Sequence, residues 1–277
     1  MSGKLYLVGT PIGNLGDFSP RAAAALEEAD FIAAEDTRVS IKLLNHLEIK
    51  KPMVGYPRHN YDTAGPQILS RLLAGETCAL VTDAGMPAIS DPGEDLVRLC
   101  AENAITVETV PGPSALICAL ALSALPTGRF TFEGFLPTNK KNRRAHLQSL
   151  LGEERTMIFY EAPHKLKDTL DDLLSTFGDR PISLSREITK LHEETIRTTL
   201  SGAVTYFAEN EPKGEFVLVL AGAPHTEEET VTLEDAVEMV LRRRENGERM
   251  KDAVRQVSAD TGINKNELYD AALKAGQ

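Results

Sequence analysis

Tryptophan is absent from this chain, and aromatic residues of all kinds make up only 5% of its 277 residues. Cysteine is scarce as well, since Cys78, Cys100 and Cys118 each lie in an apolar run without the C-x-x-C spacing of a zinc or redox site. An odd number of such cysteines is typical of buried thiols in a reducing compartment. These absences argue against a disulfide framework and against a cysteine-ligated metal, and we expect no metal site.

Long hydrophobic runs are also missing. The longest apolar stretch, residues 115–125, is too short to span a bilayer. Met1–Leu5 does not resemble a signal peptide, because it leads directly into a strand-like segment. We therefore expect a soluble protein of the cytoplasm without a membrane partner.

Positive charge is in short supply, because 30 Lys and Arg stand against 41 Asp and Glu, a net charge of −11. Such a chain is not a general binder of polyanions, so a nucleic-acid site would have to be a local basic patch. The densest basic run is TNKKNRR, in which Lys140, Lys141, Arg143 and Arg144 occur without an acid. This run is a candidate site for binding phosphate groups, or else a solvated helix start.

The composition is that of an ordinary globular protein, 42% hydrophobic and 26% charged, and the length suffices for two domains. Residues 1–125 alternate strand-like and helical segments, which predicts an α/β domain with a mostly parallel sheet covered on both faces. Closer β-rich runs in residues 126–224 predict a second α/β domain with an antiparallel or mixed sheet. Residues 225–277 are predicted to be a helix-turn-helix-like module, joined through a polar linker at residues 223–230.

The expected strands of the first domain are 4–8, 30–34, 53–56, 78–82 and 106–110. Those of the second are 130–136, 156–160, 182–186, 193–200 and 216–220. Expected helices include 40–47, between the second and third strands, and 143–151, after the first strand of the second domain.

Three loops rich in glycine and proline follow expected strands of the first domain. They are Val8–Asp17 (VGTPIGNLGD), Thr82–Gly93 (TDAGMPAISDPG) and Val110–Ala115 (VPGPSA). Glycine permits positive φ and close approach of the backbone to a ligand, and ligands bind where parallel strands end. The glycine spacing matches neither the dinucleotide nor the P-loop pattern. The second loop, rigid and doubly acidic, favours a binding function over a plain surface turn.

Acidic residues after two of the expected strands are candidates for acid–base chemistry: Glu35 and Asp36 after the strand 30–34, and Asp91 in the loop after the strand 78–82. Asp36 is equally suited to cap the following helix. No Ser/His/Asp, H-E-x-x-H or clustered His/Cys pattern is found, so interpretations as a hydrolase or a metalloenzyme have little support.

Six ordered segments, TPIGNLGD, AEDTR, TDAGMPAISDPG, VPGPSA, FYEAPHK and SREITKLHEE, resemble the ribosomal RNA small subunit methyltransferase I family. That family belongs to the tetrapyrrole-methylase-like (class III) methyltransferases. The match runs from about Lys4 to Gly222 and continues into the C-terminal helices. The resemblance implies a homodimer that binds S-adenosylmethionine between two α/β domains. It further implies 2′-O-methylation of a cytidine in the decoding region of small-subunit ribosomal RNA.

The resemblance also implies site residues. The implied cofactor contacts are Pro11, Asp83, Ala84, Gly85, Met86, Ile89, Ser114, Ala115, Tyr160, Glu187, Gly214 and Glu215. One departure is Met86, which stands where threonine is common and leaves the Gly-x-Pro turn intact. The expected RNA contacts are Arg38, Lys140, Lys141, Arg143 and Arg144.

For catalysis, a 2′-hydroxyl is a poor nucleophile at neutral pH, so a nearby base would help. Glu35, Asp36 and Asp91 are the acids whose loops should face the cleft, and the sequence does not rank them. Methyl transfer itself is an in-line displacement in which positioning can supply much of the rate, without a metal.

Two alternatives stay open at this point. One is a methylase of the same fold that acts on a small tetrapyrrole-like substrate, and the other is a non-catalytic RNA-binding or assembly protein. The basic run and the C-terminal module favour RNA, and the low net attraction for RNA favours an assembled or nearly assembled small subunit as substrate.

Overall fold

Five parallel strands form the first sheet, in the order β3-β2-β4-β1-β5. The strands are β1 (Lys4–Val8), β2 (Phe31–Ala34), β3 (Met53–Gly55), β4 (Cys78–Val81) and β5 (Thr106–Val110). The central strands β2 and β4 are buried at every position, as their uninterrupted apolar sequences FIAA and CALV require. The predicted parallel sheet is confirmed.

Helices cover both faces of this sheet. They are α1 (Pro20–Glu28), α2 (Thr37–His46), α3 (Tyr61–Leu73) and α4 (Glu94–Glu102), with a short 3₁₀ turn η1 (Leu15–Asp17). Leu26 of α1 and Leu44 of α2 pack in the core on one face, and Ile68 of α3 and Leu96 of α4 pack in the core on the other. All five strands end at one edge, where their connecting loops meet.

The second sheet is mixed and has the order β6-β7-β10-β8-β9. Its strands are β6 (Phe130–Phe135), β7 (Thr156–Glu161), β8 (Pro181–Arg186), β9 (Glu194–Thr199) and β10 (Phe216–Leu220). β6 pairs with β7 in parallel, and the other pairs are antiparallel. Of the two predicted forms, antiparallel or mixed, the sheet takes the mixed one, and the fold is that of two α/β parts followed by helices. The chain division near residue 126 stays a prediction.

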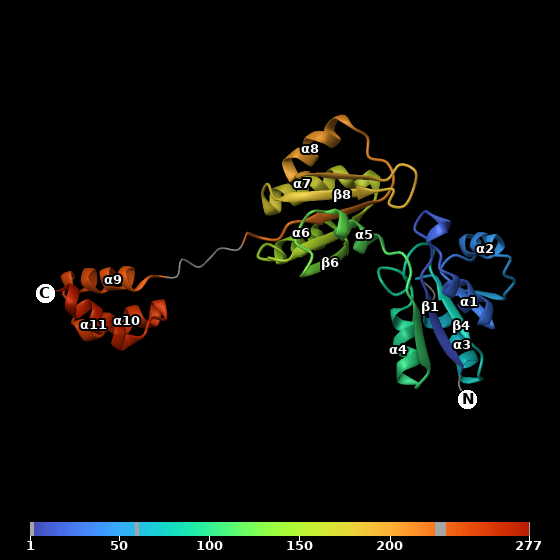
Figure 1. Ribbon diagram of the computed structural model, residues 1–277, viewed down its shortest axis with the longest axis horizontal. Coiled ribbons are helices and arrows are strands. Elements are labelled where there is room, and N and C mark those ends of the chain that lie inside the picture. The colour runs from blue at the N-terminus through green and yellow to red at the C-terminus, as the bar shows by residue number, and fades with distance from the viewer. Residues whose placement is uncertain (1–2, 59–60, 225–230, 277) are drawn as a thin grey trace. The chain divides into compact units, whose positions relative to one another are not determined.

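The two faces of the second sheet are covered differently. α6 (Lys140–Ser149), η2 (Pro163–Lys165), α7 (Leu166–Phe177) and α8 (Leu200–Glu209) follow its strands. Leu170 of α7 and Phe207 of α8 share a core with Phe159 of β7, whereas the neighbouring Ile158 belongs to the core that includes α5 (Ala115–Leu122). Figure 1 shows α5 where the chain passes from the first sheet to the second. This apolar helix, ALICALAL, covers the second face of the mixed sheet.

Two helices begin three residues earlier than the sequence pattern predicts, because polar side chains cap them. The Asp36 carboxylate accepts from the Arg38 amide at 2.8 Å and starts α2 at Thr37. Asn139 Oδ1 accepts from the Lys141 amide at 3.0 Å and starts α6 at Lys140. The basic run therefore occupies the first turns of a helix.

The computed structural model describes residues 3–58, 61–224 and 231–276, which divide into two units between Ala223 and Pro224. The second unit holds α9 (Leu233–Glu245), α10 (Met250–Thr261) and α11 (Lys265–Ala275) around a small apolar core. Gly262, at φ +72°, ends α10 and forms the predicted glycine-containing turn. Of the predicted linker 223–230, residues 225–230 lie outside the described residues.

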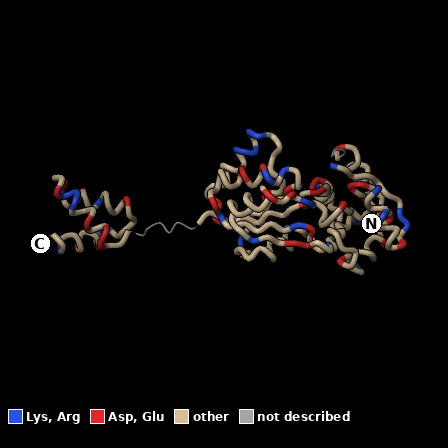
Figure 2. The backbone as a smooth tube through the Cα atoms, turned by 90° about the horizontal axis from the view of Figure 1, so that it is seen from above, with Lys and Arg blue, Asp and Glu red and all other residues tan. Residues whose placement is uncertain are grey.

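Charges of both signs are interspersed along the first unit and along the C-terminal helices (Figure 2). Within the described residues, no helix combines the length and the apolar character that crossing a membrane requires.

Candidate active site

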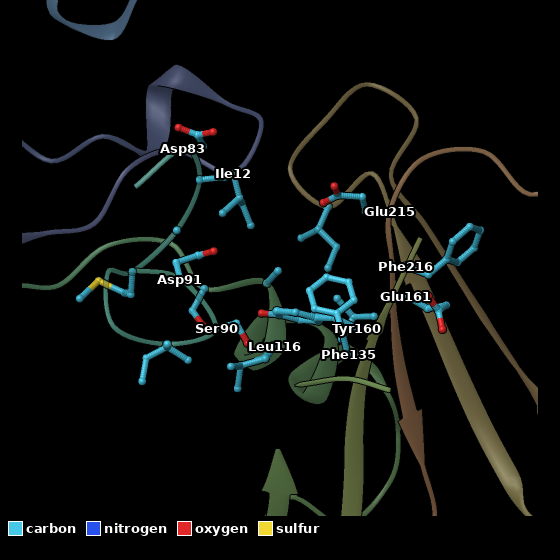
Figure 3. Close-up of a pocket in the computed structure, with 18 of the residues that line it drawn as sticks. Ile12, Asp83, Ser90, Asp91, Leu116, Phe135, Tyr160, Glu161, Glu215 and Phe216 are labelled. Atoms are coloured by element: carbon cyan, nitrogen blue, oxygen red, sulfur yellow. The ribbon is translucent and has the colours of Figure 1, made fainter. Parts of the chain in front are cut away.

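A cavity of about 290 Å³ lies between the two sheets of the first unit (Figure 3). One wall comes from loops of the first sheet, and the facing wall comes from the second sheet and the start of α5. The lining residues are Ile12, Glu35, Asp83, Ala84, Gly85, Met86, Ile89, Ser90, Asp91, Ser114, Ala115, Leu116, Phe135, Tyr160, Glu161, Glu187, Ile188, Lys190, Glu215, Phe216 and Val217. The cavity has the concave, mixed polar and apolar character of a ligand site.

Backbone hydrogen bonds fasten the loops after β1, β4 and β5 to one another. The amide of Thr10 donates to the carbonyl of Gly85 at 2.9 Å, and the Gly85 amide donates back to the Thr10 carbonyl at 3.1 Å. The amide of Gly112 contacts the sulfur of Met86 at 3.2 Å. A Cβ atom at Gly9 would come within 2.6 Å of the Gly112 Cα, so only glycine permits this approach. The first wall is therefore a fixed main-chain surface.

The loops after β2 and β4 are joined in the same way. The amide of Asp83 donates to the Glu35 carboxylate at 3.2 Å, and the amide of Asp36 donates to the Asp83 carboxylate at 3.2 Å. This exchange holds Glu35 and Asp83 side by side at the edge of the cavity.

The loop from Thr82 to Gly93 has an unusual backbone. Gly85 has φ +86°, and two residues with side chains, Ala88 and Ser90, have φ +68° and φ +64°. Arg58 donates a hydrogen bond to the carbonyl of Ser90. Positive φ at residues other than glycine costs free energy and is concentrated at functional sites, so this loop has the features of a binding loop.

Aromatic side chains form part of the facing wall. Tyr160, near the end of β7, packs edge-on against Phe132 and Phe135 of β6 at centroid separations of 5.0 and 5.5 Å. Burial raises the pKa of Tyr160 to about 12, and a hydrogen bond with the backbone of Leu116 acts in the opposite direction. Phe135 and Tyr160 lie across the cavity from Asp91 (Figure 3).

The loop between β8 and β9 completes the facing wall. Lys190 Nζ pairs with the Glu187 carboxylate at 2.9 Å. Gly214, at φ +76°, makes room for Glu187, because a Cβ there would lie 2.5 Å from the carboxylate oxygen. Glu215 follows Gly214 and lines the cavity itself. Among the described residues of the lining, the one cationic side chain is thus already paired, and the cavity is acidic.

Desolvation changes the acid–base properties of three lining carboxyl groups. Burial, followed by the negative charge of Glu35, raises the pKa of Asp91 to about 6, while the Arg58 guanidinium opposes the rise. Burial also raises the pKa of Glu35 and of Asp83, and the backbone amides that donate to these two groups oppose the rise. Asp91 is therefore a lining acid that titrates close to neutrality.

Ten of the twelve predicted cofactor contacts line the cavity, and Pro11 and Gly214 do not. Both are adjacent to lining residues, Ile12 and Glu215. Of the three predicted catalytic acids, Glu35 and Asp91 line the cavity, whereas Asp36 lies outside it as the cap of α2. Asp36 also pairs with Arg38 at 2.6 Å, and the hydrogen bonds from this arginine lower the pKa of Asp36 to about 2.

Sequence reasoning did not select several lining residues, among them Phe135, Ser90 and Lys190. Glu161 is another, although Figure 3 shows its carboxylate turned away from the cavity. It accepts from Thr169 Oγ1 at 2.5 Å. The sequence did contain one signal for Phe135, namely its position in the segment GFLP, directly before the basic run TNKKNRR.

The expected RNA contacts on α6 do not line the cavity, and they differ among themselves. Lys140, Lys141 and Arg144 are exposed. The side chain of Arg143 is only 11% exposed, because its guanidinium donates to Asp172 at 2.5 Å and to Thr169 at 2.8 Å. Arg143 thus holds α6 on α7, and its predicted phosphate contact is at odds with this placement.

Within residues 3–58, 61–224 and 231–276, no three histidine, cysteine or acidic side chains are grouped so that they could hold a metal ion. The polar chemistry that the structure displays is that of carboxylates and backbone amides.

Two family models match this chain. The model described as tetrapyrrole (corrin/porphyrin) methylases matches residues 4–204, and that of the RsmI C-terminal HTH domain matches residues 231–276.

Similar proteins extend over nearly the whole chain. A protein named ribosomal RNA small subunit methyltransferase I from Synechocystis sp. is 47% identical over 98% of this chain and 98% of its own. A protein of the same name from Halalkalibacterium halodurans is 48% identical over 97% of this chain and 94% of its own. One from Thermotoga maritima is 49% identical over 79% of this chain and 99% of its own, so that relative is shorter.

Solved structures share the fold at low identity. Uroporphyrin-III-C-methyltransferase from Thermus thermophilus superposes with a TM-score of 0.55 at 18% identity, covering 79% of this chain and 92% of that chain. A diphthine synthase gives a TM-score of 0.60 at 15% identity, covering 79% of this chain and 90% of that chain. At this identity the likeness concerns the fold alone.

Proposed function

This chain belongs to the ribosomal RNA small subunit methyltransferase I family, and from that premise we propose its substrate, its donor and the roles of its residues. The proposed reaction is transfer of a methyl group from S-adenosylmethionine to the 2′-oxygen of a cytidine in the decoding region of small-subunit ribosomal RNA. The observation that carries the proposal is the acidic cavity between the two sheets, in a chain similar to named rRNA methyltransferases over 98% of its length.

The cavity fits the donor in charge. S-adenosylmethionine supplies a methyl group on a positively charged sulfur, from which an oxygen nucleophile can displace it in line. Five of the lining carboxylates, from Glu35, Asp83, Asp91, Glu187 and Glu215, make the surroundings favourable for a cation.

The first wall is the proposed donor site. Its candidate residues are Asp83, Ala84, Gly85, Met86, Ile89, Ser114 and Ala115, with Tyr160, Glu187 and Glu215 opposite. Ser114 makes no side-chain cap bond at the start of α5, so its hydroxyl is available for a ligand. Because hydrogen bonds between loops fix the main chain in advance, binding costs little reorganisation.

Asp91 is the proposed proton acceptor. With a pKa of about 6 it is largely deprotonated at pH 7 and basic enough to take a proton from a hydroxyl as the new bond forms. Glu35 is the second candidate, but its carboxylate already accepts from the Asp83 amide. Asp36 is not retained as a base, since it caps α2 and pairs with Arg38.

The proposal includes a homodimer that acts in the cytoplasm on the assembled small subunit. Exposed cations of α6, which are Lys140, Lys141 and Arg144, are the proposed phosphate contacts, with the exposed Arg38 as a further one. A small tetrapyrrole-like substrate has less support, because it needs neither these cations nor the second unit. A purely structural RNA-binding role would leave the acidic donor cavity without a use.

The proposal is tested by mapping 2′-O-methyl groups in ribosomal RNA from cells with and without this protein. We expect one cytidine of the small-subunit RNA to lose its 2′-O-methyl group in the protein's absence. An identical map in both strains would refute the proposed substrate. Transfer in vitro to assembled subunits but not to naked ribosomal RNA is the expected preference, and equal transfer to both would contradict it.

A further inference from the structure

Phe135 is a large apolar side chain that stands in the cavity wall and is nonetheless 57% exposed. It packs edge-on against Tyr160, which keeps one side of the ring supported. Other large apolar residues of the described chain are exposed as well, so the feature that points to a partner is the position of this aromatic ring in the wall of a ligand cavity.

A β-bulge directs Phe135 to this side of the sheet. The register between β6 and β7 shifts between Phe132 and Gly134, with Phe132 opposite Ile158 and Phe135 opposite Tyr160. Ile158 and Tyr160 share one face of β7, so Phe132 and Phe135 share it too, although Phe135 lies three positions after Phe132. Without the extra residue, alternation would turn Phe135 to the opposite face.

Two features hold the bulge in place. Gly134 has φ +63°, a conformation that residues with side chains rarely adopt. The carboxylate of Glu133, the extra residue, lies 2.9 Å from Nε2 of His146 on α6, within hydrogen-bond distance. The strand β6 thus lacks regular pairing with β7 at one position, and this irregularity places the ring of Phe135 at the cavity.

Positive charge follows the ring closely in the chain. Lys140, Lys141 and Arg144 are exposed at the start of α6, and among the described residues none of the three has an acidic partner. Lys140 lies five positions after Phe135, a span of at most about 18 Å. An apolar π surface that is followed closely in the chain by unpaired cations matches the chemistry of one short stretch of single-stranded RNA, whose bases stack and whose phosphates carry charge.

Building on the proposed function, we propose that Phe135, supported by Tyr160, is a stacking platform for an unstacked nucleobase of the acceptor RNA, either the target cytosine or its neighbour. The platform holds the nucleotide against the facing wall, while the 2′-oxygen points toward the first wall, near Asp91. A ribose inside a folded subunit is reached only if its nucleotide leaves the stack, and an aromatic surface compensates for the stacking that the base gives up.

The absence of tryptophan makes a direct test possible. Phe135→Trp places a single indole in the chain at the platform, and supplying it as 5-hydroxytryptophan gives a fluorescence that is excited separately from the tryptophans of the subunit's own proteins and reports a stacked base. We expect quenching on addition of small subunits and little change on addition of S-adenosylmethionine alone. The matched control is Tyr206→Trp, at an aromatic residue of α8 that is 39% exposed and does not line the cavity, where neither addition should change the signal.

Kinetics give the complementary test. Phe135→Ala should raise KM for small subunits roughly 10- to 100-fold, with donor affinity unchanged, since one base–aromatic stack is removed. Phe135→Leu should restore little, and Phe135→Trp should restore most of the loss. Thermal unfolding and sedimentation of each variant check that fold and oligomeric state are retained.

Three results would overturn the inference. If Phe135→Ala methylates subunits with wild-type KM and kcat, the ring holds no base. If it weakens S-adenosylmethionine binding as much as subunit binding, the ring holds the donor's adenine instead. If it changes the oligomeric state, a second copy of the chain covers the ring. A wild-type protein that transfers no methyl group to subunits would overturn the proposed function itself and the inference with it.

Discussion

The two sheets of the first unit differ in what they contribute to the cavity wall. The parallel sheet contributes main chain, in loops where Gly85, Ala88 and Ser90 have positive φ and where carbonyls and amides bond across loops. The mixed sheet contributes side chains, among them the aromatic rings of Phe135 and Tyr160. In the proposed function, this contrast assigns the donor to a site shaped largely by backbone geometry and the acceptor to a wall of side chains.

On the parallel-sheet side of the cavity, we expect the largest effect from Gly85→Val. A β-branched residue does not tolerate φ +86°, so the loop must rearrange and release the bonds to Thr10. We expect S-adenosylmethionine affinity to fall by about 100-fold or more in calorimetry. Gly152→Val is the control, since a Cβ there has open space and its φ is not positive.

Replacing Ser114 and Ala115 with bulky residues should have the same effect as Gly85→Val, and normal affinity in both variants would remove the donor-site assignment.

Asp91→Asn tests the chemistry between the two walls. If Asp91 is the base, kcat should fall by roughly 10²- to 10⁴-fold, a loss much larger than the decrease in donor affinity from removing one lining charge, while subunit affinity stays the same. The wild-type rate should rise with pH as the carboxyl group releases its proton around pH 6, and the variant should lack this inflection. Glu35→Gln serves as the comparison. Near-normal turnover in both variants would mean that catalysis here is purely positional.

Reversing the charges of Lys140, Lys141 and Arg144 tests whether the part of the chain with the mixed sheet binds the acceptor RNA. The triple Glu variant should bind subunits more weakly and with a flatter salt dependence, because the log–log slope falls by about one unit for each phosphate that the protein no longer neutralises. Donor affinity should not change. Arg143→Ala is the contrasting variant, because it leaves Asp172 and Thr169 without their donor and should lower stability by about 1–3 kcal/mol. An unchanged salt slope in the triple variant would place the RNA elsewhere.

The smallest expected effect is on stability. The pKa of Asp91 is higher in the folded chain than the ordinary value of 3.8, so the folded state binds the proton more tightly. Stability from this group therefore falls as pH rises from about 4 to about 6 and stays lower above that range. Asp91→Asn should remove this contribution, so that the Tm of the variant relative to wild type is higher at pH 7 than at pH 4. Thermal scans of both proteins across this range measure the difference, and parallel curves would contradict it.

Much of this architecture was predictable, because its signals are local. Buried runs such as CALV and FVLVL specify central strands, and the Gly/Pro loops mark where parallel strands end. The helix starts at Thr37 and Lys140 were missed because caps, not periodicity, determine them. Two facts were beyond reach of a linear pattern: the bulge that turns Phe135 into the cavity, and the pairing of Arg143 with Asp172, which is 29 residues away.

The central claim, methyl transfer to a ribose oxygen of small-subunit RNA, is tested most directly with isotopically labelled S-adenosylmethionine. Small subunits from cells that lack this protein are incubated with it and the labelled donor, and the RNA is digested to nucleosides for mass spectrometry. The account predicts one labelled methyl group per subunit, located on the 2′-oxygen of a cytidine. Label on a base, on another nucleoside or nowhere in the RNA would contradict it.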